Sequence, residues 1–359
     1  MAKQKVVGKS TNESREIKTS LYNKEEIFKM LALAESSSLP CLLIGEPGTG
    51  KTKAVLEYAK AWLNRDGQMT AEDFANKIYI LETDEGTKIS EVKGMPDLSV
   101  LFTENKYELN APITNAEIII INEVDKASAG IRNAMLGIMN EKFLFNGKCK
   151  IPCKWKLFIA TCNTIPKDEI KNAFWDRFML KMEVDRISSG ELMKYYEKGG
   201  KDYVAKFVLN IPNKEEVASV SLSNAKMEKY LQVGYDGSSD RTLTFVPYLT
   251  KAISYIWDVS IDKALVKTAQ VMLTQAAASS LQQLLVSPEL KIIMSKVELL
   301  RSYSGDSLKN AIDEIEIMIK TYAINGKLNE EDVAEIESSM KYILQGADIS
   351  SIEEVIELV

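Results

Sequence analysis

The sequence contains no histidine among its 359 residues. This absence excludes a Ser-His-Asp triad, a Cys-His dyad and every zinc site with a histidine ligand. Cysteine is scarce as well: Cys149 and Cys153 have the spacing of metal ligands, but no second pair completes such a site. Any catalysis must therefore use carboxylates, lysine, arginine, hydroxyls, backbone amides or a bound metal ion.

Long apolar runs are also missing. No segment reaches the roughly 18–20 apolar residues of a membrane-spanning helix, so we expect no membrane partner. Residues 1–20 are polar and mildly basic and have no apolar stretch, so we expect no secretory signal. With free cysteines in a long chain, this favours a cytoplasmic location. The formal net charge of −6 suits a protein partner better than non-specific nucleic-acid binding.

Short apolar runs alternate with helical patterns in the first half of the chain. The apolar runs cover 41–44, 78–81, 118–121, 157–160 and 179–184. Helical spacing covers 22–35, 51–63, 127–139 and 168–175. Wholly apolar runs of this length are typical of strands buried on both faces of a parallel sheet. We therefore predict an α/β domain over 21–188, with a parallel sheet flanked by helices, after a flexible tail at 1–20.

The second half of the chain has a different pattern. The Asn146-Gly147 pair lies between two extended stretches and predicts a β-hairpin that leads into the strand at 157. Beyond Ser188 we predict no strands. Helical spacing covers 191–210, 214–231, 243–266, 269–286, 289–302 and the stretch from 329 to 344. We therefore predict an α-helical lid at 189–268 and a C-terminal helical region at 269–359.

The most specific motif follows the first apolar run. It fits G-x-x-x-x-G-K-[ST] and reads Gly45-Glu46-Pro47-Gly48-Thr49-Gly50-Lys51-Thr52. Glycines let such a loop wrap so that backbone N–H groups point at phosphate oxygens, and the dipole of the following helix adds to the attraction. Lys51 can reach the β- and γ-phosphates, and the hydroxyl of Thr52 can ligate Mg²⁺. The motif predicts a site for a nucleoside triphosphate and Mg²⁺.

A second candidate site comes directly after the apolar run at 118–121. Asn122 and Glu123 stand at its C-terminal end, which faces the ligand crevice in a parallel sheet. Glu123 is the candidate general base for the water that attacks the γ-phosphate. Asn122 occupies the place of an aspartate that helps to hold Mg²⁺ in most P-loop enzymes, and its amide keeps an oxygen acceptor without the charge. We assign Asn122 with Thr52 to metal binding; the alternative is that both strand-end residues only cap the strand.

Taken in order, these motifs resemble those of the AAA+ ATPases, and within that group the MoxR family. The segment Asn122-Glu123-Val124-Asp125-Lys126-Ala127 lines up with the family's Asp-Glu-Ile-Asn-Arg-Ala. The other matching segments are the P-loop, the hairpin, Phe158-Ile159-Ala160-Thr161-Cys162-Asn163, Phe174-Trp175-Asp176-Arg177-Phe178 and Ser239-Asp240-Arg241. The resemblance implies an ATP hydrolase that uses ATP and Mg²⁺, with an AAA+ fold, a pre-sensor-1 β-hairpin and a helix-2 insert at 94–112.

The resemblance also implies catalytic roles for three further residues. Asn163 would be sensor 1, which orients the attacking water. Arg177 would be the arginine finger on the nucleotide of a neighbouring subunit, and Arg241 would be sensor 2, which reaches the γ-phosphate from the lid. A guanidinium suits both tasks because it is always charged and forks onto phosphate oxygens. The simpler alternatives are that Asn163 is a turn residue, that Arg177 forms a surface ion pair and that Arg241 is a charge at a helix start.

A finger that acts in trans requires a homo-oligomeric ring, and the rings of the family are usually hexamers. The resemblance therefore implies an ATP-driven machine that remodels a protein client, often with a separate von Willebrand factor A protein. One alternative is a nucleic-acid motor or loader that uses the hairpin lysines 148, 150, 154 and 156; the same lysines can equally be a solubilising face. Another is an ATP-binding scaffold with weak or no hydrolysis, because Asn122 lacks the aspartate charge.

Overall fold

The computed structural model describes residues 13–64, 70–104, 109–146, 149–166, 173–212, 217, 222–234, 243–273, 275–325, 327–328 and 330–344. The chain divides into two compact units, Met1–Ser279 and Ser280–Val359, and each is described by itself. Within the described residues, no helix combines the length and the apolar character that crossing a membrane requires.

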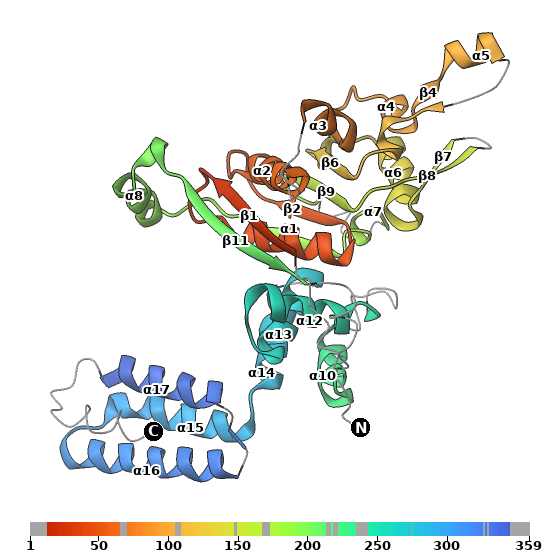
Figure 1. Ribbon diagram of the computed structural model, residues 1–359. Coiled ribbons are helices and arrows are strands. Elements are labelled where there is room, and N and C mark those ends of the chain that lie inside the picture. The colour runs from red at the N-terminus through yellow and green to blue at the C-terminus, as the bar shows by residue number, and fades with distance from the viewer. Residues whose placement is uncertain are drawn as a thin grey trace, which may run out of the picture. The chain divides into compact units, whose positions relative to one another are not determined.

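A five-stranded parallel sheet forms the centre of the first unit, in the order β10-β2-β9-β6-β3 (Figure 1). Its strands are β2 (Cys41–Ile44), β3 (Ile78–Glu82), β6 (Ile118–Asn122), β9 (Leu157–Cys162) and β10 (Leu180–Glu183). Every residue of β6 and of β9 is buried. Helices on both faces of a parallel sheet account for such burial, so the predicted α/β fold is confirmed.

Five helices of the described residues pack with this sheet or with its neighbours. They are α1 (Glu25–Ser37), α2 (Lys51–Leu63), α3 (Ala71–Lys77), α6 (Ala129–Glu141) and α7 (Ala173–Asp176). The helix α6 begins because the hydroxyl of Ser128 accepts a hydrogen bond from the N–H of Ile131. It ends at Lys142, whose φ of 55° is left-handed.

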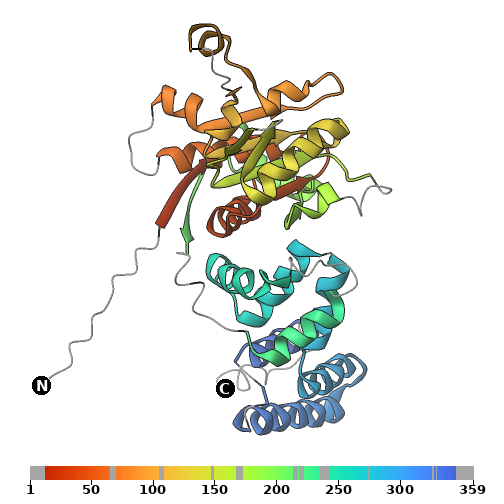
Figure 2. The same cartoon turned by 90° about the vertical axis from the view of Figure 1, so that its right-hand side faces the viewer.

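Two antiparallel pairs extend from the first unit. The predicted hairpin is formed by β7 (Phe143–Asn146) and β8 (Cys149–Pro152). A short helix, α4 (Ile89–Lys93), precedes β4 (Met95–Pro96), α5 (Leu98–Glu104) and β5 (Leu109–Asn110), and β4 pairs with β5. The elements from β4 to β5 lie within 94–112, where we expected the helix-2 insert. In both views α5 stands away from the rest of the unit (Figure 1 and Figure 2).

A further antiparallel pair contradicts two of our sequence predictions. Residues 13–19, which we assigned to a flexible tail at 1–20, form β1 (Glu13–Thr19), and β1 pairs with β11 (Ala205–Ile211). Residues 191–210 are not one helix, because α8 (Ser189–Glu197) ends before β11 begins. The prediction that strands end at Ser188 is therefore wrong for β11. Residues 1–12 lie outside the described part of the chain.

The cause of both errors is a short period-two pattern within otherwise polar sequence. In β1 the buried residues Arg15, Ile17 and Thr19 alternate with exposed ones. In β11 burial alternates in the same way, although exposed Val208 is apolar. Phe207 of β11 packs on Phe28 of α1 with ring centroids 5.0 Å apart. Such alternation is typical of a strand with one buried face.

The remaining helices of the first unit are α10 (Asn224–Gly234), α12 (Val246–Trp257) and α13 (Ile261–Met272), and α14 (Gln275–Leu285) follows. We predicted one helix over 243–266; it is interrupted instead, because Asp258 is left-handed with φ of 52° and Ser260 caps a new start.

The second unit has its own core. It contains α15 (Pro288–Leu299), α16 (Gly305–Ile324) and α17 (Glu330–Leu344) side by side (Figure 1 and Figure 2). Apolar residues of all three helices, among them Ile293, Ile315 and Ile336, form one buried cluster.

Candidate nucleotide-binding site

The predicted phosphate-binding loop lies between the end of β2 and the start of α2. Its backbone requires glycine at two positions, since φ is 81° at Gly48 and 91° at Gly50, a region that side chains disfavour. A Cβ at Gly50 would also lie 2.9 Å from Cδ2 of Leu21. The helix α2 begins directly after Gly50, so its N-terminus opens onto the loop, as an anion-binding site requires.

The side chain of Lys51 lies inside this loop. Lys51 is only 7% exposed, and its Nζ donates hydrogen bonds to the carbonyl oxygens of Gly45, at 2.5 Å, and Glu46, at 3.0 Å. Burial lowers the pKa of Lys51, and the charges of Asp125 and Glu123 oppose that shift. The carbonyl oxygens thus hold the ammonium group inside the loop, where it could reach a bound phosphate.

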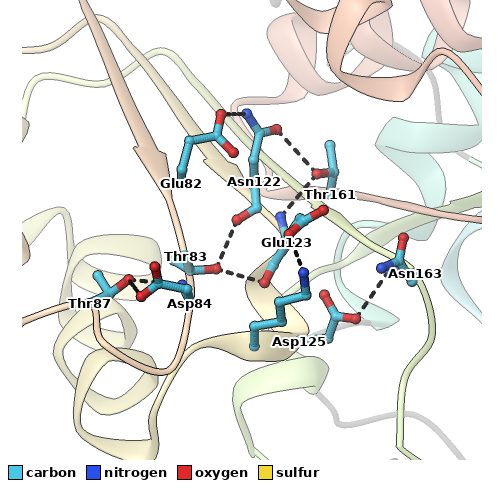
Figure 3. Close-up of polar contacts among 10 residues, drawn as sticks. Glu82, Thr83, Asp84, Thr87, Asn122, Glu123, Asp125, Thr161 and Asn163 are labelled. Atoms are coloured by element: carbon cyan, nitrogen blue, oxygen red, sulfur yellow. Dashed lines mark hydrogen bonds and ion pairs between the residues drawn. The ribbon is translucent and has the colours of Figure 1, made fainter. Parts of the chain in front are cut away.

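Asn122, at the end of β6, is the centre of a hydrogen-bond network (Figure 3). It is 1% exposed, and its Oδ1 accepts from the hydroxyls of Thr161, at 3.2 Å, and Thr52, at 3.4 Å. Its Nδ2 donates to Oε1 of Glu82, at 2.5 Å. The structure thus brings the two predicted metal-site residues, Thr52 and Asn122, together across neighbouring elements.

Glu123 has an unusual backbone conformation for a residue with a side chain. Its φ is 54°, and two threonines hold it there: its N–H donates to Oγ1 of Thr161 at 3.3 Å, and its carbonyl accepts from Oγ1 of Thr83 at 2.6 Å. Such conformations concentrate at functional sites. The carboxylate is half-exposed and pairs with Lys126, with Oε2 and Nζ 2.5 Å apart, which raises the pKa of Lys126.

Asn163 follows β9, the strand between β6 and β2, and its N–H donates to Oδ2 of Asp125 at 3.3 Å. The other carboxylate oxygen of Asp125 is buried and has no hydrogen-bond partner among the described residues. Figure 3 shows Asp125 and Glu123 beside the ends of these strands. The predicted sensor and the predicted base are therefore close in space.

The two predicted arginines have different outcomes. Arg177 follows α7, pairs with Asp176 at 3.1 Å and has a buried Nε without a hydrogen-bond partner among the described residues. Its place there matches both a finger for a neighbouring subunit and a surface ion pair. Arg241 lies outside the described residues.

A cavity of about 530 Å³ lies beside the phosphate-binding loop. The loop lines one part of it, and the segment that precedes α1 and the segment around the start of α8 line the rest, with Tyr22, Ile187 and Tyr195. The rings of Tyr22 and Tyr195 are 5.9 Å apart. A flat apolar group that extends from the phosphates would find aromatic surface here.

Sequence reasoning missed this cavity and three polar residues, Glu82, Thr83 and Thr161. The sequence contains one signal for Glu82, since this residue directly follows the apolar run at 78–81 and the carboxyl ends of parallel strands share one edge. That its strand neighbours β6 is seen only in the structure.

Comparison with known proteins agrees with this geometry. Residues 9–218 match the family bpMoxR, described as the MoxR domain in the MoxR-vWA-beta-propeller ternary systems. Two uncharacterized proteins of Methanocaldococcus jannaschii are 26% and 25% identical over 193 and 228 residues. These alignments cover 52% and 60% of this chain but 48% and 56% of the relatives, so the chain spans about half their length.

A solved structure has a similar fold. The crystal structure of a proposed ATPase of Cytophaga hutchinsonii superposes with a TM-score of 0.50 and 17% identity. The match covers 70% of this chain and 82% of that protein. The family match extends over more than half of the chain and includes the phosphate-binding loop, the strand-end pair and the hairpin. This chain therefore belongs to the MoxR family of AAA+ ATPases.

Proposed function

We propose that this protein hydrolyses ATP in a homo-oligomeric ring, a hexamer as is usual in its family, and uses the energy to remodel a protein client. The observation that carries the proposal is the convergence of the phosphate-binding loop, the strand-end pair Asn122-Glu123 and Asn163 at one edge of the sheet. These groups would supply phosphate binding, metal binding, a base and a water-orienting amide, which are the parts of a phosphoryl-transfer site that one subunit contributes.

The geometry supports ATP as the ligand. The backbone of the loop and Lys51 would bind the phosphates, and the cavity that Tyr22 and Tyr195 line would hold the base. The oxygen ligands at the adjoining edge fit Mg²⁺, because the hydroxyl of Thr52 faces the amide oxygen of Asn122. In addition, one buried carboxylate oxygen of Asp125 has no hydrogen-bond partner among the residues that the structure describes. A bound Mg²⁺ would neutralise part of the phosphate charge.

Glu123 is the proposed base. Its ion pair with Lys126 is exposed on both sides, with side chains 46% and 49% accessible. Exposed pairs stabilise a protein by only about 0–1 kcal/mol, so the carboxylate can turn from Lys126 toward a water at little cost. The backbone of Glu123 stays fixed by the threonine hydrogen bonds during that turn. Asn163 would orient the same water.

Assembly into a ring would give the side chain of Arg177 a function at a neighbouring subunit. Within the described part of the chain its buried Nε has no hydrogen-bond partner, and its side chain is 29% exposed beside Asp176. We propose that it reaches the γ-phosphate on the neighbouring subunit. Arg241 is proposed as sensor 2 on the resemblance alone.

The client surface is proposed to include the insert around α5. Its large apolar side chains are unusually accessible, at 82% for Phe102, 63% for Met95 and 60% for Leu98. Exposed apolar patches of this kind are typical of protein-binding sites.

The matched family is described in MoxR-vWA-beta-propeller systems, which supports a separate von Willebrand factor A partner.

The hairpin favours this proposal over a nucleic-acid motor. Lys150 lies over the ring of Phe143, 4.1 Å from its centroid. Lys154 donates a hydrogen bond to Asn115 and Lys156 forms an ion pair with Glu117, so both lysines have partners at the base of the hairpin. Lys148 lies outside the described residues.

Steady-state hydrolysis of ATP in the presence of Mg²⁺ tests the proposal. We expect turnover by the wild type, loss of nucleotide binding and hydrolysis in Lys51→Ala, and binding without hydrolysis in Glu123→Gln. The expected loss in Glu123→Gln is about 10²–10⁴-fold, the usual contribution of a general base. A wild-type rate of hydrolysis no higher than that of Lys51→Ala would instead favour a nucleotide-binding scaffold.

A further inference from the structure

The strand-end pair lacks the negative charge that an aspartate would bring to the metal. The register of the sheet places another carboxylate beside that position, because Glu82 of β3 is the parallel partner of Asn122 in β6. Oε1 of Glu82 accepts a hydrogen bond from Nδ2 of Asn122 at 2.5 Å (Figure 3). An exposed glutamate and a buried asparagine are thus joined at the edge where we place Mg²⁺.

The glutamate determines which way the amide faces. An ionised carboxylate only accepts hydrogen bonds, so the NH₂ group of Asn122 must point toward Glu82. The amide oxygen then points away from Glu82, where it accepts from Thr161 and from Thr52 of the phosphate-binding loop. Without Glu82 the amide could turn over and present its N–H groups to a cation.

The same hydrogen bond joins the amide of Asn122 to a charged acceptor. A hydrogen bond to an ionised acceptor is roughly twice as strong as a neutral one. It polarises the amide and makes the oxygen of Asn122 a better acceptor. Asn122 is 1% exposed, so its side of this bond is shielded from water although the carboxylate of Glu82 is exposed.

We propose that Glu82 is a positioning residue of the Mg²⁺ site, which acts through Asn122 to replace the missing aspartate. The inference rests on the proposed function, since it assumes that nucleotide and Mg²⁺ bind at this edge. It has a distinctive consequence: Asn122→Asp, which restores the usual residue, sets two carboxylates within hydrogen-bond distance and is unfavourable while Glu82 is ionised.

Calorimetric titration with a non-hydrolysable ATP analogue tests the proposal without relying on activity. The readout is the ratio of the affinity in excess Mg²⁺ to the affinity in excess EDTA. For Glu82→Gln and for Asn122→Asp we expect this ratio to fall about tenfold, the effect of losing one charge-assisted hydrogen bond. In the double variant Glu82→Gln with Asn122→Asp, the ratio returns to the wild-type value. Glu85→Gln, which removes the same charge from an exposed position nearby, leaves it unchanged.

Each outcome has one meaning. A wild-type ratio in Glu82→Gln, or a double variant no better than the single ones, overturns this inference and leaves the proposed function intact. An equal loss in Mg²⁺ and in EDTA makes Glu82 a structural residue and also overturns it. A wild-type protein that binds no analogue under either condition overturns the proposed function itself. A wild-type ratio in the double variant supports the proposal that a negative charge at position 122 can replace the one at position 82. A normal affinity of the double variant in EDTA shows that its phosphate-binding loop is folded.

Discussion

Individual residues at the site combine rigid backbone with a movable carboxylate. Thr83 and Thr161 hold the left-handed backbone of Glu123, while its side chain pairs with Lys126 at the surface. This arrangement fixes the backbone of Glu123, the proposed base, and would leave its carboxylate free to reach a water. The buried amide of Asn122, in contrast, has hydrogen-bond partners on both its oxygen and its nitrogen.

The exposed pair gives a prediction at this scale. We expect Lys126→Ala to change the free energy of unfolding by no more than about 1 kcal/mol, because exposed ion pairs stabilise little. Hydrolysis should be at least as fast as in the wild type, since the carboxylate of Glu123 loses a competing partner. Thermal unfolding and steady-state turnover check this, with exposed Lys60→Ala as the control. A fall to the level of Glu123→Gln would show that Lys126 holds the base in its working position.

Local spacing in the sequence predicts where several candidate site residues lie, and their roles stay predictions. The phosphate-binding loop, Asn122, Glu123 and Asn163 all follow buried strands, and parallel strands bring their carboxyl ends to one edge. Glu82 and Thr161 were missed because their roles depend on which strands are neighbours, and strand order is a property of the fold. The cavity beside Tyr22 was missed for the same reason, since its walls come from distant segments.

At the scale of elements, the β1–β11 pair is the main departure from expectation. It joins the start of the described chain to a segment that follows the parallel sheet, and its inner face covers α1 through Phe207 and Phe28. Its buried face is hard to recognise in the sequence, because Ile17 is the only apolar residue among the buried ones of β1 and the exposed Val208 of β11 is apolar. The short, wholly apolar runs of the parallel strands are easy to recognise in the sequence because both of their faces are buried.

This pair can be tested through Ile17, which is fully buried in β1. We expect Ile17→Ala to lower the free energy of unfolding of the first unit by about 2–5 kcal/mol, the usual effect of truncating a buried isoleucine. Lys18→Ala, at the next and exposed position of the same strand, should change it by less than about 0.5 kcal/mol. Denaturation by urea, followed for both variants, provides the comparison. Equal and small effects would indicate that residues 13–19 are a tail after all.

The hairpin gives a second prediction at this scale. Because Lys150 lies over Phe143 and the next two lysines have partners, we expect DNA and RNA to leave the rate of hydrolysis unchanged at low salt. Hydrolysis measured with and without each polymer checks this. Stimulation that disappears in Lys150→Ala would favour a nucleic-acid motor instead, since contacts to phosphates are electrostatic and are strongest at low salt.

At the scale of the whole molecule, the chain combines an AAA+ unit with a separate helical unit that has its own core. Helical spacing predicts the helices of the second unit, but their assembly around Ile293, Ile315 and Ile336 depends on long-range packing. The matched family model ends at residue 218, so the family assignment rests on the first unit.

The central claim is that ATP binds at the phosphate-binding loop of one subunit and that Arg177 of the next subunit completes the site. Co-expression of Glu123→Gln with Arg177→Ala, each inactive by itself, tests this most directly. Random mixing in a ring gives about a quarter of the sites an intact base and an intact finger. We predict that the mixed assembly regains hydrolysis well above either variant alone. Hydrolysis that stays at the level of the single variants, in an assembly shown to contain both, would contradict the account.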